Sequence, residues 1–173
     1  IFRNQARFEE MEILVWGPGK PKRGTPPTNR LGWKKRLEIK RQIKRTFPNA
    51  VVRFSEDADI SQATKWLDDK LARQAAQALG ADCIIILEMS RGSDLEVDKF
   101  VENYSWFRGK SYILLPERYV NSGGLVDVVL DKLPPGHVIG YTQQEFDDCA
   151  VAKEKAIHIV TQVAMKLFTN RFA

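Results

Sequence analysis

One short apolar run restricts what this chain can fold into. Residues 83–87 read Cys-Ile-Ile-Ile-Leu, a run that is too short for a helix and rich in β-branched side chains. Such a run is typical of a strand that is buried on both faces of a parallel sheet. The polar turn 90–93 follows, and an amphipathic pattern from Asp94 onward predicts the start of a helix. Open α/β sheets bind their ligands where a buried strand leads through a polar turn into a helix.

Strand-like and helix-like segments alternate along the whole chain. This alternation predicts a mainly parallel sheet with helices on both faces, because parallel strands need crossover connections. We expect a single three-layer α/β domain over residues 12–173, preceded by a leader of residues 1–11. Its five strands are expected in the flavodoxin-like order 2-1-3-4-5. The other expected strands are 12–16, 50–54, 111–115 and 138–141, and the other expected helices are 33–47, 60–79 and 142–168.

Helical periodicity also predicts where one aromatic and three basic side chains lie. Trp66 is expected in the buried stripe of helix 60–79. Arg36, Lys40 and Lys44 fall inside the apolar arc of helix 33–47, so some of them are expected to extend to the edges of that arc.

The composition indicates an ordinary globular protein of 173 residues. No apolar run approaches the ~20 residues that a membrane span needs, and no signal-peptide pattern opens the chain. No metal-binding spacing links Cys83 and Cys149, so we expect reduced thiols, a cytoplasmic setting and no metal site. Whether the protein forms a homo-oligomer, or belongs to a longer chain, stays open.

Positive charge is concentrated in one segment. Between Lys20 and Arg45 there are eleven Lys or Arg residues and one acid, Glu38. A local patch of this kind suggests a phosphate-bearing partner, although a solvated helix face explains it equally well. The segment is also dense in Pro and Gly from residue 20 to residue 32, which predicts a long, mobile loop. The residues expected to contact a polyanion are Lys20, Lys22, Arg23, Lys34, Arg41 and Arg45.

The expected strand order places the first and third strands side by side. The loops that follow them, residues 17–30 and 90–94, would then flank one crevice at the carboxyl edge of the sheet. His137 lies in a loop that could fold over this crevice, whereas His158 lies mid-helix and is expected to be packed or solvated. The residues expected to bind a nucleotide there are Trp16, Gly17, Pro18, Gly19, Ser90, Gly92, Ser93 and Asp94.

Two short motifs carry a resemblance. Gly17-Pro18 follows the first expected strand, and Gly92-Ser93-x-x-Glu96 opens the helix after the third. This arrangement resembles the nucleoside 2-deoxyribosyltransferases, which have Gly-Pro and Gly-Thr-x-x-Glu at these places, and more distantly the TIR-type NAD-cleaving domains. The chain departs from the transferase pattern in having Ser93 for Thr, Asp98 where a Gly is common, and a long basic insert at residues 20–30.

The resemblance implies a role for Glu96 at the anomeric carbon of a ribosyl unit. A carboxylate can stabilise or trap the oxocarbenium-like charge that develops when an N-glycosidic bond breaks. The implied activity is cleavage or exchange of that bond in a nucleoside, a nucleotide or NAD. NAD would then be a substrate, and no cofactor is implied.

Other interpretations of the same residues remain open. Ser93-x-x-Glu96 is also a capping box, in which the Glu side chain accepts from its own helix N-terminus and has no catalytic role. The domain would then be a non-catalytic nucleotide sensor. A nucleic-acid-binding module that uses residues 20–45 ranks last, because Trp16 and Trp33 are too few for a stacking platform.

Overall fold

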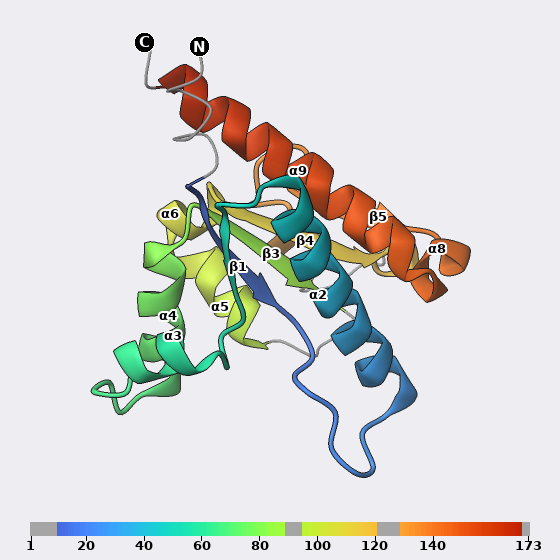
Figure 1. The fold of residues 1–173 in the computed structure, drawn as a ribbon, viewed down its shortest axis with the longest axis horizontal. Helices are drawn as coiled ribbons and strands as arrows, with labels where there is room; N and C mark the ends of the chain where they lie inside the picture. The colour runs from blue at the N-terminus through green and yellow to red at the C-terminus, as the bar shows by residue number, and fades with distance from the viewer. Residues whose placement is uncertain (1–9, 89–94, 121–128, 171–173) are drawn as a thin grey trace.

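The computed structural model describes residues 10–88, 95–120 and 129–170, without the side chains of Leu95, Glu96 and Asn170 (Figure 1). Helices and strands alternate through the chain, as expected. The strands are β1 (Glu12–Trp16), β2 (Val51–Arg53), β3 (Cys83–Leu87), β4 (Ser111–Pro116) and β5 (Val138–Tyr141). The helices are α2 (Pro27–Thr46), α3 (Ala58–Ala63), α4 (Lys70–Gly80), α5 (Leu95–Asn103), α6 (Ser105–Arg108), the 3-10 helix η1 (Glu117–Tyr119), α8 (Gln143–Asp147) and α9 (Cys149–Asn170).

The five strands form one parallel sheet in the order β2-β1-β3-β4-β5. The flavodoxin-like order predicted from the sequence is therefore confirmed. Ile13 pairs with Cys83 and Trp16 pairs with Ile86, so β1 and β3 end side by side. The loops that leave these two strands consequently start at the same edge of the sheet.

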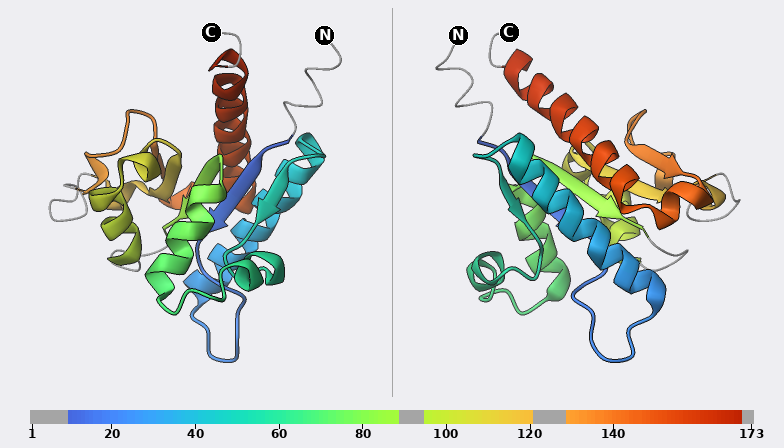
Figure 2. Two further views of the ribbon diagram at one scale, coloured as in Figure 1. Left: turned by 90° about the vertical axis from the view of Figure 1, so that its left-hand side faces the viewer. Right: turned by 45° about the vertical axis from the view of Figure 1, so that its right-hand side comes forward.

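The central strand β3 is buried on both faces, as its composition predicts. Cys83, Ile85 and Leu87 belong to the core under α2 and α9, whereas Ile84 and Ile86 face the core under α4, α5 and α6. Figures 1 and 2 show these two helical layers on opposite sides of the sheet. The three-layer architecture follows from this alternation, since successive side chains of a strand point to opposite faces.

The helix expected over residues 60–79 is interrupted. α3 ends at Ala63, and α4 begins again at Lys70 after its N-cap Asp69, whose side chain accepts from the Ala72 N–H at 2.9 Å. An Asp at this position favours a new helix start because it satisfies an orphan N–H group. Trp66 lies in the connection and is 77% exposed, so the prediction that it is buried was wrong.

Two other helix boundaries differ from the expected ones. The helix expected over residues 142–168 is divided at Asp148, whose carboxylate accepts from the Ala150 N–H and begins α9. α2 begins at Pro27, six residues before the expected start, because a proline fits the first turn of a helix. The loop after β1 is correspondingly shorter than predicted. Among the described residues, no helix combines the length and the apolar character that crossing a bilayer requires.

Candidate functional site

A cavity of about 500 Å³ opens at the carboxyl edge of the sheet. It lies where β1, the neighbouring β2 and the helices α4 and α5 converge. Its described walls are Trp16 at the end of β1, Gly17, Gly19, Lys20 and Lys22 in the β1–α2 loop, Ser55 and Glu56 in the β2–α3 loop, Lys70 and Gln74 in the first turns of α4, and Val97 in the first turn of α5. The cavity lies at the edge of the sheet where a crevice was predicted, and the predicted residues Trp16, Gly17 and Gly19 line it. Loop 90–94, the other wall expected from the strand order, lies outside the described residues.

Gly17 shapes the exit of β1. Its φ of +150° belongs to a region that side chains rarely adopt. A Cβ atom built on Gly17 would lie 3.0 Å from the Leu87 Cβ and 3.2 Å from the Arg36 Cδ. The first turn after β1 therefore passes so close to the end of β3 and to α2 that only glycine fits there.

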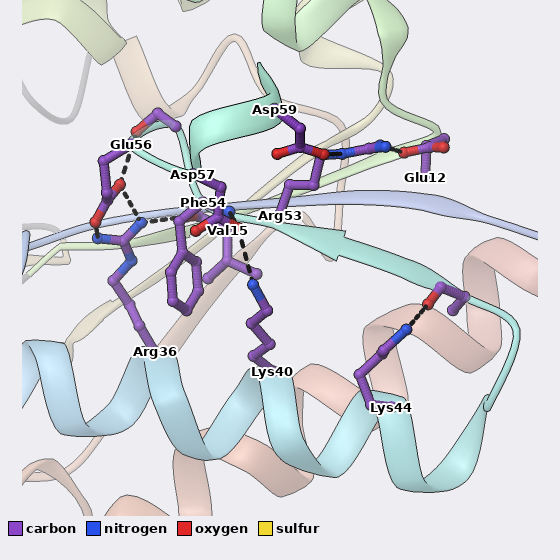
Figure 3. A network of polar contacts seen from close by, with 12 residues as sticks. Glu12, Val15, Arg36, Lys40, Lys44, Arg53, Phe54, Glu56, Asp57 and Asp59 are labelled. Carbon is purple, nitrogen blue, oxygen red and sulfur yellow. Dashed lines mark hydrogen bonds and ion pairs between the residues drawn. The ribbon is translucent and has the colours of Figure 1, made fainter. Parts of the chain in front are cut away.

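Arg36 of α2 fixes the loop that Gly17 begins. Its guanidinium Nη2 donates to the Val15 carbonyl at 2.9 Å (Figure 3). Nη1 donates to the Gly17 carbonyl at 3.2 Å and to the Pro18 carbonyl at 2.9 Å. These three carbonyls belong to the end of β1 and to the loop that follows it. Pro18 contributes its carbonyl to this network and does not line the cavity.

The same guanidinium binds Glu56 with both of its terminal nitrogens. The distances are 2.7 Å from Nη1 to Oε1 and 3.0 Å from Nη2 to Oε2. The Arg36 side chain is fully buried and stacks over the Phe54 ring at 4.2 Å, whereas the Glu56 side chain is 40% exposed. Lys40 and Lys44 reach partners at the edges of the helix, namely Asp57 and the Ala50 carbonyl, but Arg36 remains inside.

Trp16 closes the inner wall of the cavity. It is buried, and its ring lies 5.5 Å from that of Phe100 and 5.6 Å from that of Phe107. This aromatic cluster holds α5 and α6 against the end of β1. The first turn of α5 is thereby fixed at the cavity.

Glu96 belongs to that first turn. It immediately precedes Val97, which lines the cavity, so the backbone at Glu96 lies beside the cavity wall. Its side chain is not among those described. Ser90, Gly92, Ser93 and Asp94 lie outside the described residues, so their predicted roles stay predictions.

The predicted polyanion residues divide into two groups. Lys20 and Lys22 line the cavity, whereas Lys34, Arg41 and Arg45 are exposed along α2. Arg23 is also exposed, and it is not among the residues that line the cavity.

Lys35 is a buried residue of this segment that sequence reasoning missed. Its Nζ lies 4.6 Å from the centre of the Tyr141 ring and 4.8 Å from that of Phe146. Burial lowers the pKa of the Lys35 ammonium. The sequence could have indicated this burial. Lys35 is four residues from both Leu31 and Ile39, and residues at that spacing share one helix face.

Glu56 was missed as well. An acidic residue shortly after the second strand was the available signal, since dinucleotide-binding folds use an acid of their first βαβ unit to hold a ribose hydroxyl.

The two histidines lie away from this cavity. His137 immediately precedes β5 and therefore lies at the amino edge of the sheet, so it does not fold over the crevice at the carboxyl edge. It stacks on Tyr112, its Nδ1 lies 2.8 Å from the Ser111 carbonyl, and burial lowers the pKa of its imidazole. His158 is exposed on α9 and lies 2.9 Å from Gln162, in agreement with the expected solvated position.

Comparison with known proteins shows no family for this chain. No protein-family model matches the sequence, and a search of curated proteins finds no match. The candidate site therefore rests on its residues alone.

Proposed function

We propose that the protein binds a nucleotide in the cavity at the carboxyl ends of β1 and β2 and cleaves or exchanges its N-glycosidic bond. Glu96 is the proposed catalytic residue. One observation supports this most: the cavity wall includes Val97, so the helix turn that carries Glu96 borders the same space as the glycine loop after β1.

The charges at the cavity suit a phosphorylated ligand. Lys20 and Lys22 line it, while the charge of Glu56 is balanced by Arg36. Positive charge on these described wall residues attracts phosphate groups and speeds their association. The glycine backbone at Gly17 and Gly19 lets a ligand approach closely, because no side chain covers it.

The proposed chemistry requires an ionised carboxylate at C1′ of the sugar. Departure of the base leaves oxocarbenium-like charge on the ribosyl ring, and Glu96 would stabilise this charge or form a covalent glycosyl intermediate. Water then gives hydrolysis, and a second base gives exchange.

Release of free base, or of nicotinamide, from a panel of nucleosides, nucleotides and NAD tests the proposal. Glu96→Gln preserves a side-chain oxygen that can serve a capping box, so the variant should stay folded within about 1 kcal/mol. It should lose cleavage by orders of magnitude, because each ~1.4 kcal/mol of lost transition-state stabilisation is about tenfold in rate.

Ser93→Ala is the matched control. If Ser93 caps the helix in the expected capping box, this substitution should lower stability while it spares more of the activity. If the wild type binds a nucleotide but cleaves nothing on the panel, the catalytic proposal is wrong and the domain is a nucleotide sensor.

A second surface supports a separate proposal for polyanion binding. Lys34, Arg41 and Arg45 are exposed on α2, and the seven- and four-residue intervals between them place them on one helix face. We propose that this face, together with Lys20, Lys22 and Arg23, contacts a phosphate-rich chain.

A further inference from the structure

Among the described residues that line the cavity, Glu56 is the one carboxylate. Its Oε1 accepts from Arg36 at 2.7 Å, while its Oε2 accepts from Arg36 at 3.0 Å and from the Ser55 hydroxyl at 3.2 Å. Ser55 lines the same cavity. The two side chains are thus held next to one another at the end of β2.

This arrangement leaves lone pairs on Glu56 and Ser55 that can accept hydrogen bonds from a ligand. A carboxylate oxygen has two lone-pair positions. In the described structure Arg36 occupies one of those on Oε1, and Ser55 donates its proton and keeps its own lone pairs. The Oε1 atom lies near Gly19, where an added Cβ would be 4.0 Å away. One acceptor, Oε1, therefore lies at the glycine loop, and a second, the Ser55 Oγ, lies on the neighbouring side chain beside Oε2.

The charges decide which kind of donor suits these acceptors. Arg36 already balances the charge of Glu56, and Lys20 and Lys22 line the same cavity. An ammonium group would be repelled there, whereas a neutral hydroxyl would not. Two adjacent hydroxyls, as on carbons 2 and 3 of ribose, match acceptors on two neighbouring side chains.

We propose that Glu56 and Ser55 hold the ribose diol, so that the site selects ribonucleotides over 2′-deoxyribonucleotides. This inference rests on the proposed nucleotide binding and goes beyond it by naming the sugar. It differs from the sugar in the name of the 2-deoxyribosyltransferases, and it agrees with the ribosyl unit expected at Glu96. A site built to hydrogen-bond a hydroxyl discriminates strongly against the analogue that lacks it, because its buried polar groups are left unpaired.

The first test uses the wild-type protein. Calorimetric titration would compare AMP, GMP, CMP and UMP with the matching 2′-deoxynucleotides, and AMP with 3′-deoxy-AMP. We expect Kd to be at least about tenfold higher for each deoxy form of a nucleotide that binds, since hydrogen bonds to charged groups are the stronger ones. Equal Kd values would overturn this inference and leave the proposed function intact. Binding of no member of the panel would contradict the proposed function itself.

Glu56→Gln separates sugar recognition from a purely structural role. It should bring the ribo-to-deoxyribo ratio of Kd values toward one, whereas mere loosening of the loop would weaken both ligands equally. Asp57→Asn is the matched control, because Asp57 joins the same loop to α2 through Lys40 at 2.8 Å without lining the cavity. The ratio should be unchanged in that control.

Ser55→Ala provides an independent variant in case Glu56→Gln unfolds. It leaves the Arg36–Glu56 pair in place and should reduce the ratio several-fold. A ratio that stays at its wild-type value in both Glu56→Gln and Ser55→Ala would overturn the assignment of these residues.

Discussion

Arg36 and Glu56 form a two-point ion pair, with Nη1–Oε1 and Nη2–Oε2 distances of 2.7 and 3.0 Å, that joins α2 to the end of β2. The same guanidinium donates to three carbonyls at the end of β1. Two loops of the candidate cavity are therefore positioned by one buried side chain. Replacing the planar guanidinium of Arg36 should therefore affect both the stability of the fold and the shape of the cavity.

Arg36→Lys should lower the free energy of unfolding by about 2 kcal/mol, because a lysine keeps the charge but cannot reproduce two parallel hydrogen bonds to a carboxylate. Denaturant titration measures the change. Arg41→Lys on the same helix is the control: Arg41 is exposed and pairs with Glu38, so its replacement should change stability by less than about 0.5 kcal/mol. Equal effects of the two substitutions would show that the buried pair contributes little.

Gly17→Ala should destabilise the protein by about 3 kcal/mol. Backbone strain at a φ of +150° costs about 1–3 kcal/mol, and the new methyl group would meet the Leu87 Cβ at 3.0 Å. Gly80→Ala offers a matched comparison, because a Cβ there meets nothing within 4 Å and no unusual φ is involved. That substitution should be neutral or stabilise by up to about 1 kcal/mol. Thermal unfolding of both variants tests the difference.

Lys35→Met should increase stability at neutral pH. Burial lowers the pKa of Lys35 in the folded protein, so the unfolded chain binds its proton more readily. Stability attributable to Lys35 therefore rises with pH between the lowered folded pKa and the unfolded value of 10.5. The gain in the free energy of unfolding from Lys35→Met should be largest below this pH window and should shrink as pH approaches 10.5.

Urea titrations across this pH range measure the Lys35 effect. Lys34→Met, which changes an exposed neighbour, should have little effect at any pH. An advantage for Lys35→Met that does not depend on pH would assign the gain to packing and not to the buried charge.

Reversing the charges of Lys34, Arg41 and Arg45 to Glu should weaken binding of heparin or single-stranded nucleic acid. The dependence of log K on log salt should also become shallower, by roughly 0.7–0.9 for each phosphate that the variant no longer neutralises. Binding measured by fluorescence anisotropy at several salt concentrations gives both quantities.

A control for total charge is available on other elements. Lys65, Lys99 and Lys132 are exposed and lie outside α2. Their reversal to Glu changes the net charge equally, and it should leave most of the binding and its salt slope intact. If both triple variants lose binding to the same extent, net charge explains the effect and the α2 face has no special role.

The sequence by itself determined the framework of the molecule. The β-branched run at residues 83–87 and the alternation of strands and helices predicted the parallel sheet and its order, because both signals are local and periodic. The glycine loop after β1 was equally predictable, since Gly17 and Gly19 follow directly on a strand. These features also predicted a candidate site at the carboxyl edge of the sheet.

Tertiary structure decided what the charged and aromatic side chains do. Periodicity placed Arg36 on the inner face of α2, but its burial depends on Glu56, and Lys35 is buried because Tyr141 and Phe146 cover it from the other end of the chain. Trp66 fits a helical stripe by spacing, yet α3 ends at Ala63 and α4 begins only after its cap at Asp69, which leaves Trp66 exposed in the connection. A buried charge is stable only with partners. Those partners come from distant segments, so only the folded chain reveals them.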